Sequence, residues 1–142
     1  MFYGNNRNDI RQIYFGAWQA ARTGKPLEPL QQQIVEVIQI HPEYQNFLGN
    51  MDNIDQDFSP EQGQSNPFLH MGMHMAIKEQ LSVNQPMGIK GVYKKLLEKH
   101  PDPHAVEHQI MESLAEILWQ AQSNQTEPDM AKYLEKLRKL CE

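Results

Sequence analysis

The sequence is poor in cysteine, because its 142 residues include only Cys141. A single thiol excludes a disulfide within the chain, and it excludes zinc or redox sites that need a pair of cysteines. Disulfides belong to oxidising compartments, so this composition favours a reducing one. We expect no role for Cys141 itself.

Long apolar runs are also missing. No segment approaches the roughly 20 apolar residues that span a bilayer. Residues 1–7 lack the continuous apolar stretch of a signal peptide. We therefore expect a cytoplasmic protein of the bacterial type, with no membrane partner.

Basic charge is scarce as well: 13 lysines and arginines stand against 18 acidic residues, which gives a formal net charge of −5. Binding to a nucleic-acid backbone depends on clustered basic side chains, so we expect no nucleic-acid partner. The sequence contains no Gly-rich phosphate loop and no Gly-x-Ser-x-Gly nucleophile turn. These absences exclude the commonest nucleotide and hydrolase sites.

The sequence does contain apolar residues at helical spacing, in stretches that begin at proline or a capping residue. We predict an all-α fold: one domain, residues 1–142, forming a compact bundle of five to six helices. No strand pattern of useful length is evident. The expected helices are 9–22, 27–41, 67–81, 86–99, 103–122 and 128–140, with a short turn at 43–48 and a long polar loop at 49–65.

The expected helix 67–81 is apolar around almost its whole circumference, which is typical of a buried helix. His70 and His74 are two of its few polar residues. Their separation by four residues places both imidazoles on one face, one turn apart, where they could bind one metal ion. Buried polar side chains need a partner or a function.

The expected helix 103–122 carries a second polar set, consisting of His104, Glu107, His108 and Glu112. Helical geometry puts Glu107 near the centre of the apolar face, where an unpaired carboxylate is costly to bury. We predict that this helix and helix 67–81 are central and pack together. Bundles build metal sites by pointing histidines and carboxylates inward from facing helices.

Two interpretations of these residues remain open. In the first, His70, His74, Glu107 and His108 bind Zn, Fe or Mn, with His41, His104 and Glu112 as further candidates. Glu79 or Glu112 would then be the candidate catalytic base. In the second, the same side chains form a structural polar network, in which Glu107 caps a loop or pairs with Lys78. His41 fits either interpretation, because it could also be a cation at the end of a helix.

The rival function is a non-catalytic interaction module or homodimer that needs no metal. Its binding surface would be the methionine-rich helix 67–81 and the acidic segment Asp52 to Glu61. The spacing of carboxylates and histidines does not match the Glu-x-x-His pairing of di-iron bundles. The reaction, if there is one, cannot be named from the sequence.

Several multi-residue motifs occur along nearly the whole chain in a fixed order. They are His41-Pro-Glu-Tyr44, Asn66-Pro-Phe-Leu-His70 with His74, Glu79-Gln80, Pro86-x-Gly88-Ile89, Glu107-His108 with Glu112, Leu118-Trp119 and Ala121-Gln122. Together they resemble an uncharacterised proteobacterial family, domain-of-unknown-function family 1841. The resemblance implies a bacterial intracellular protein and brings no activity with it.

Overall fold

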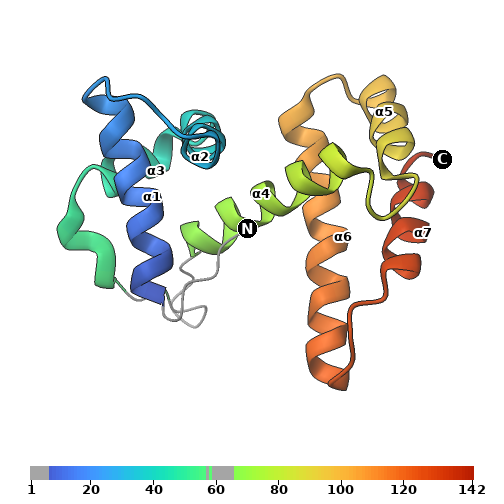
Figure 1. Ribbon diagram of the computed structural model, residues 1–142. Coiled ribbons are helices and arrows are strands. Elements are labelled where there is room, and N and C mark those ends of the chain that lie inside the picture. Colours follow the sequence, from blue (N-terminus) through green and yellow to red (C-terminus); the bar gives the residue numbers. More distant parts are fainter. Residues whose placement is uncertain (1–6, 57, 59–65) are drawn as a thin grey trace. The chain divides into compact units, whose positions relative to one another are not determined.

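The computed structural model describes residues 7–56, 58 and 66–142 (Figure 1). Over these residues the chain is helical and contains no strand, which confirms the predicted all-α class. The elements are α1 (Arg7–Arg22), α2 (Pro29–Gln39), α3 (Pro42–Leu48), the 3₁₀ helix η1 (Met51–Asp55), α4 (Pro67–Val83), α5 (Ile89–Lys99), α6 (Pro103–Asn124) and α7 (Met130–Leu140).

The helix starts follow from prolines and short polar side chains, as the sequence indicates. α2, α3, α4 and α6 each begin at a proline, where the missing backbone N–H costs nothing. The side chain of Asn66 accepts a hydrogen bond from the amide of Phe68 at 2.9 Å, and Asp102 accepts one from the amide of His104 at 3.1 Å. These caps satisfy amides that have no partner within the helix.

Several helix ends differ from the prediction by about two residues, and three segments differ by more. Residues 42–48 form the helix α3 rather than a turn, so the described residues contain seven α-helices instead of five to six. α5 begins at Ile89 rather than at Pro86, because Gly88 before it has a left-handed φ of 103°. The expected loop 49–65 contains η1, while residues 57 and 59–65 of that loop lie outside the described residues.

The chain divides into two compact units, one up to Met75 and one from Ala76. α4 runs through the boundary, so its first nine residues belong to unit 1 and its last eight to unit 2. That residues 1–142 form one domain, with α4 and α6 at its centre, stays a prediction.

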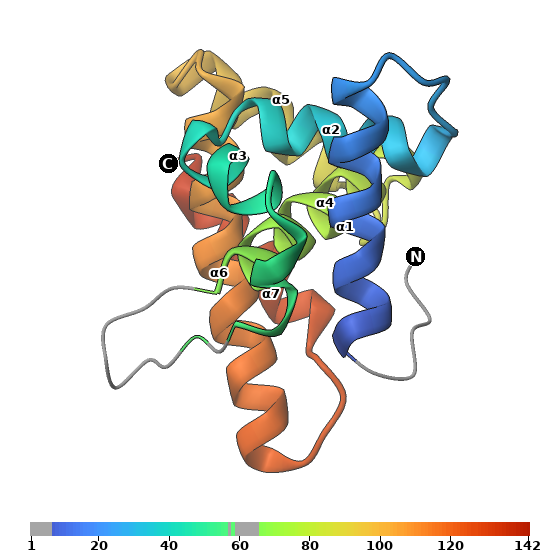
Figure 2. The ribbon, with the colours of Figure 1, turned by 90° about the vertical axis from the view of Figure 1, so that its left-hand side faces the viewer.

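Unit 1 is built around aromatic side chains. α1 packs against α2 and α3, and η1 lies against both α1 and α3 (Figure 2). The ring of Phe68, in the first turn of α4, contacts the rings of Tyr14, Phe15, Phe47 and Phe58 at centroid distances of 5.7–6.4 Å. Such edge-to-face and tilted contacts stabilise beyond the buried area alone. The first turn of α4 is therefore firmly anchored in the core of unit 1.

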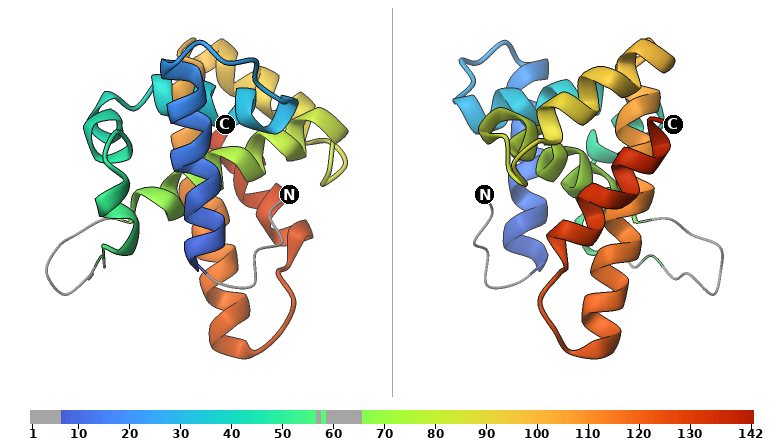
Figure 3. Two further views of the ribbon diagram at one scale, coloured as in Figure 1. Left: turned by 60° about the vertical axis from the view of Figure 1, so that its left-hand side comes forward. Right: turned by 90° about the vertical axis from the view of Figure 1, so that its right-hand side faces the viewer.

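Unit 2 contains α5, α6 and α7, each of which contacts the other two (Figure 3). Its buried core includes Ile89, Leu96, Ile110, Ile117 and Leu137. The end of α4 joins this unit through the hydroxyl of Tyr133, which donates to the side-chain oxygen of Gln80 at 2.8 Å.

The burial prediction for helix 67–81 is wrong in detail. Leu69 on α4 is 65% exposed, so this helix is not buried around its whole circumference. Leu118 on α6 is a second exposed leucine. In the part of the chain that the structure describes, no helix is long and apolar enough to span a bilayer.

The buried phenol of Tyr14 should make stability fall at alkaline pH. Burial raises the pKa of Tyr14 to about 12, above the value of about 10 for an exposed tyrosine. The unfolded chain therefore loses this proton first, and stability present below pH 10 is lost as pH rises toward the folded pKa. We expect Tyr14→Phe to reduce the slope of unfolding free energy against pH by up to about 1.4 kcal/mol per unit above pH 10.

Urea unfolding at pH 7, 10 and 11, followed by circular dichroism, measures this effect. Lysines titrate in the same range, but they are common to both proteins, so the difference isolates Tyr14. An identical slope in wild type and variant would contradict the burial of the phenol.

Candidate metal centre

His41 has a fixed ring orientation. It is the N-cap residue of α3, directly before Pro42, and it is 2% exposed. Its Nδ1 lies 2.7 Å from the carbonyl oxygen of Val37, in the last turn of α2. A carbonyl oxygen only accepts, so Nδ1 carries the proton and Nε2 of a neutral ring presents a lone pair. Histidines that bind metals are typically oriented by such a bond from the other ring nitrogen.

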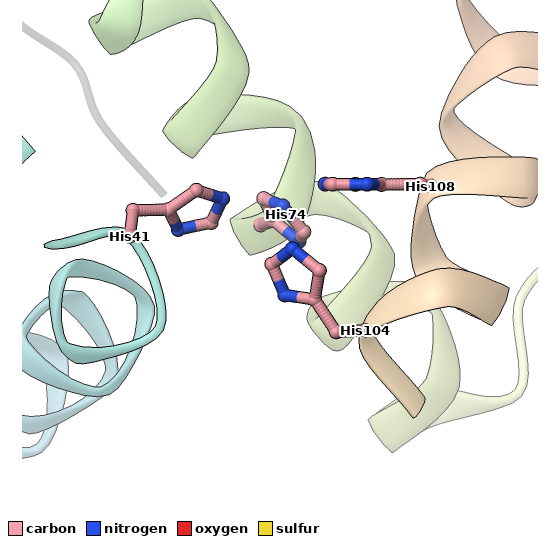
Figure 4. Close-up of side chains that lie close together, drawn as sticks. All are labelled: His41, His74, His104 and His108. Carbon is pink, nitrogen blue, oxygen red and sulfur yellow. The ribbon is translucent and has the colours of Figure 1, made fainter. Parts of the chain in front are cut away.

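The Nε2 atoms of His70 and His74 meet that of His41. His70 Nε2 lies 3.1 Å from His41 Nε2 and 3.2 Å from His74 Nε2. His70 and His74 are one turn apart on α4, as their spacing predicts. His41 and His74 also offer ring nitrogens within 4.8 Å of each other, with the His41 ring facing α4 (Figure 4). We call His41, His70 and His74 the histidine triad; all three belong to unit 1.

The short contacts in the triad cannot both be good hydrogen bonds between neutral rings. A neutral imidazole nitrogen is either a donor or an acceptor. If His70 Nε2 carries a proton, that proton can point at only one of its two neighbours. If it does not, it faces the lone pair of His41 Nε2. A cation bound by all three nitrogens removes this conflict.

The spacing of the triad also fits one metal ion. Two nitrogens at about 2.0–2.1 Å from a tetrahedral zinc ion lie about 3.3–3.4 Å apart. The two Nε2–Nε2 distances that His70 makes, 3.1 and 3.2 Å, are close to that separation.

Tyr44 lies next to the triad, although in the sequence it stands out only as the last residue of the motif His41-Pro-Glu-Tyr44. Its ring stacks on that of His41, with centroids 5.2 Å apart and planes 13° from parallel, and its edge faces His70 at 6.1 Å. Burial, with the charge of Glu43, raises the pKa of the Tyr44 phenol. In the sequence, Tyr44 follows His41 by three residues. This spacing brings the two side chains to the same side of the chain only when residues 42–48 form a helix.

Unit 2 has a histidine pair of its own, His104 and His108, in the first two turns of α6. Their ring centroids lie 4.2 Å apart, and both rings extend from the same side of the helix (Figure 4). They offer ring nitrogens within 4.8 Å of each other. His104 and His108 are four residues apart, as His70 and His74 are, so these two imidazoles also lie one turn apart on one helix face.

Glu107 lies between these two histidines in sequence and is 5% exposed, as its predicted place on the apolar face requires. Its carboxylate lies 3.9 Å from the ammonium group of Lys78 on α4. Burial, with the negative charge of Glu107, raises the pKa of Tyr93. The structure thus gives Glu107 the ionic partner that the structural interpretation named.

The two candidate bases, Glu79 and Glu112, are both exposed to solvent. Neither belongs to the histidine triad or to the histidine pair. Their role as catalytic base, and that of Glu107 and His108 as metal ligands, stay predictions.

Residues 6–139 match a family described as a domain of unknown function (DUF1841), in agreement with the resemblance seen in the motifs. No curated protein and no solved structure matches the chain.

The contact between Lys78 and Glu107 should be measurable as a coupling in stability. Removing Lys78 leaves a buried carboxylate without this cation, although Lys78 is itself one-third exposed and solvent screens the pair. We expect Lys78→Met to lower the free energy of unfolding by about 1 kcal/mol when it is made in the wild type. When it is made in the Glu107→Leu variant, the same substitution should cost much less. A double-mutant cycle by urea unfolding measures it, and additive effects of the two substitutions would show that the two side chains do not interact.

Proposed function

We propose that this chain, a member of the DUF1841 family, binds a divalent transition-metal ion through His41, His70 and His74. The carrying observation is that His70 Nε2 lies 3.1 and 3.2 Å from the other two Nε2 atoms. The proposal takes its ligands from unit 1 alone. It replaces the carboxylate ligand expected from the sequence with His41.

Three features of the triad support a metal rather than a structural network. Its nitrogens are the type of ligand that zinc, iron, copper and nickel accept. The bond from His41 Nδ1 to Val37 fixes the tautomer in which Nε2 is available. Burial of His41 and His74 removes competing water from two of the three ligands.

Zinc is the first choice among the metals considered. The triad contains no carboxylate, whereas manganese favours oxygen ligands, and non-haem iron sites of the oxygenase type include one carboxylate. Three histidines leave a fourth tetrahedral position for water or another ligand. A zinc ion bound in this way would supply Lewis-acid chemistry, as in hydrolytic sites.

The ligands that the sequence predicts on α6 are a separate proposal, within unit 2. His104 and His108 have suitable spacing for binding a metal, and Glu107 is a buried carboxylate next to them in sequence. A second zinc ion per chain that is lost in His108→Ala would support this separate proposal.

The second candidate function is a protein-binding or dimerising module. It is favoured by two adjacent apolar side chains on α6, Leu118 and Trp119, of which Trp119 is 67% exposed. Exposed aromatic side chains are enriched in protein interfaces. If this surface forms a homodimer, Trp119→Ser should convert it to a monomer, as measured by light scattering with size-exclusion chromatography. A monomeric wild type at high concentration would contradict the homodimer.

Zinc binding should depend on each member of the triad. We expect untagged wild-type protein to bind zinc in isothermal titration calorimetry, and His70→Ala to weaken that affinity by about 100-fold or more, since a ligand is lost. Because the ion binds the folded state, zinc at 100 times its dissociation constant should add about 2.7 kcal/mol to the free energy of unfolding.

His100→Ala is the matched control, because His100 is an exposed histidine at the end of α5 and outside the triad. Its zinc affinity should equal that of wild type. Circular dichroism of each variant checks that the helices are intact. Folded wild type that takes up none of zinc, iron, copper or nickel would contradict the proposal.

A further inference from the structure

Arg11 on α1 is a buried arginine, 4% exposed, and lies beside aromatic side chains of the unit 1 core. Its guanidinium stacks over the ring of Phe68 at 4.6 Å and contacts that of Phe58 at 5.7 Å. Burying a guanidinium is costly unless its donors are satisfied and its charge is compensated. Its neighbours are therefore informative about what it does.

The same guanidinium group holds the segment that follows α3. Its Nη1 donates to the carbonyl oxygens of Ile54 and Gln56, at 2.7 and 2.8 Å. These two carbonyls lie at the end of η1 and just after it. Hydrogen bonds from a charged donor are about twice as strong as neutral ones. Arg11 thus hydrogen-bonds α1 to residues 54 and 56.

Both attachments of this segment lead to an element that carries part of the histidine triad: Arg11 packs on Phe68 of α4, and Asn53 bonds to α3. Phe68, beneath the Arg11 guanidinium, is two residues before His70 in the first turns of α4. On the other side, the carbonyl of Phe47 accepts a hydrogen bond from the side chain of Asn53 at 3.0 Å. Phe47 belongs to α3, the short helix that begins at His41.

We infer that Arg11 is a positioning residue that couples the histidine triad to the segment 51–56. This inference rests on the proposed function. Through Phe68, Arg11 holds the first turns of α4, where His70 must meet His41. Through the carbonyls of Ile54 and Gln56, it docks the segment on α1. A metal ion that joins His41 to His70 and His74 fixes α3, which the segment contacts, relative to α4, whose Phe68 lies beneath the Arg11 guanidinium.

Coupling of this kind is reciprocal, because a contact that favours metal binding is itself favoured by the metal. Zinc should therefore slow the opening of residues 51–56, although none of them is a proposed ligand. Three amides report that opening: Asp52, which donates to the Asn50 side chain, Asn53, which donates to the carbonyl of Asn50, and Gln56, which donates to the carbonyl of Asn53. Hydrogen exchange at these amides measures the local opening directly.

The experiment combines hydrogen exchange with zinc calorimetry on the full chain, in wild type and Arg11→Lys. Lysine keeps the positive charge but lacks the planar fork that donates to two carbonyls while stacking on a ring. We expect zinc to slow exchange at residues 52, 53 and 56 in wild type. In Arg11→Lys we expect that slowing to be lost and zinc affinity to fall by about tenfold.

Gln12→Ala is the matched control, since Gln12 is the exposed neighbour of Arg11 on α1. It should keep both the zinc affinity and the slowing. Asn53→Ala gives a second route if Arg11→Lys does not fold, because it loosens the same segment from α3. It should reduce the slowing at residues 52, 53 and 56 and weaken zinc binding in the same direction.

The outcomes separate the two claims. If wild type binds zinc but exchange at 51–56 is unchanged, or if the folded Arg11 and Asn53 variants bind zinc as tightly as wild type, the coupling is overturned and the metal site stands. If wild type binds no zinc in calorimetry, the proposed function is overturned, and the coupling with it.

Discussion

The close approach of three imidazole nitrogens is the constraint on which the rest of unit 1 depends. Lone pairs on neighbouring rings repel one another unless a proton or a metal ion lies between them. His70 Nε2 has two such neighbours within 3.2 Å, and one proton cannot serve both. Holding the rings together without a cation would therefore cost free energy that the surrounding contacts must supply.

The contacts that supply this free energy surround the three imidazole rings. The last turn of α2 supplies the carbonyl that orients His41, and Tyr44 stacks against the same ring. Phe68 anchors the first turn of α4 among four other aromatic rings, which fixes the helix that carries His70 and His74. Each histidine is thus held by groups that do not themselves bind the metal. This preorganisation is what a metal site needs, because flexible ligands lose affinity when they are ordered on binding.

Local features of the sequence were enough to predict the helices, because their signals lie within a few residues. Pro67 and Pro103 open α4 and α6 as expected, and Asp102 caps α6. The sequence also placed Glu107 on a buried face and His70 beside His74. The sequence predicts only a turn at 43–48, because so short a segment cannot show a helical period, although Pro42 stands at the start of α3. The predicted helix start at Pro86 is wrong, because Gly88 has a left-handed conformation and α5 begins only at Ile89.

The partner of His70 and His74 was the part that could not be derived locally. His41 is 29 residues before His70, and nothing in the spacing says that the end of α2 meets the first turns of α4. Arg11 posed the same difficulty, since its carbonyl partners at Ile54 and Gln56 are more than 40 residues away and have no sequence signature. Both contacts depend on tertiary packing. For the same reason, the helical spacing that placed Glu107 on a buried face could not show that Lys78 lies beside it.

The most direct test of the account is anomalous X-ray diffraction at the zinc absorption edge, on crystals of the untagged protein grown with zinc. The account predicts an anomalous peak at about 2.0–2.1 Å from Nε2 of His41, His70 and His74 together. A zinc ion bound elsewhere, with the three Nε2 atoms facing one another and no peak between them, would contradict it.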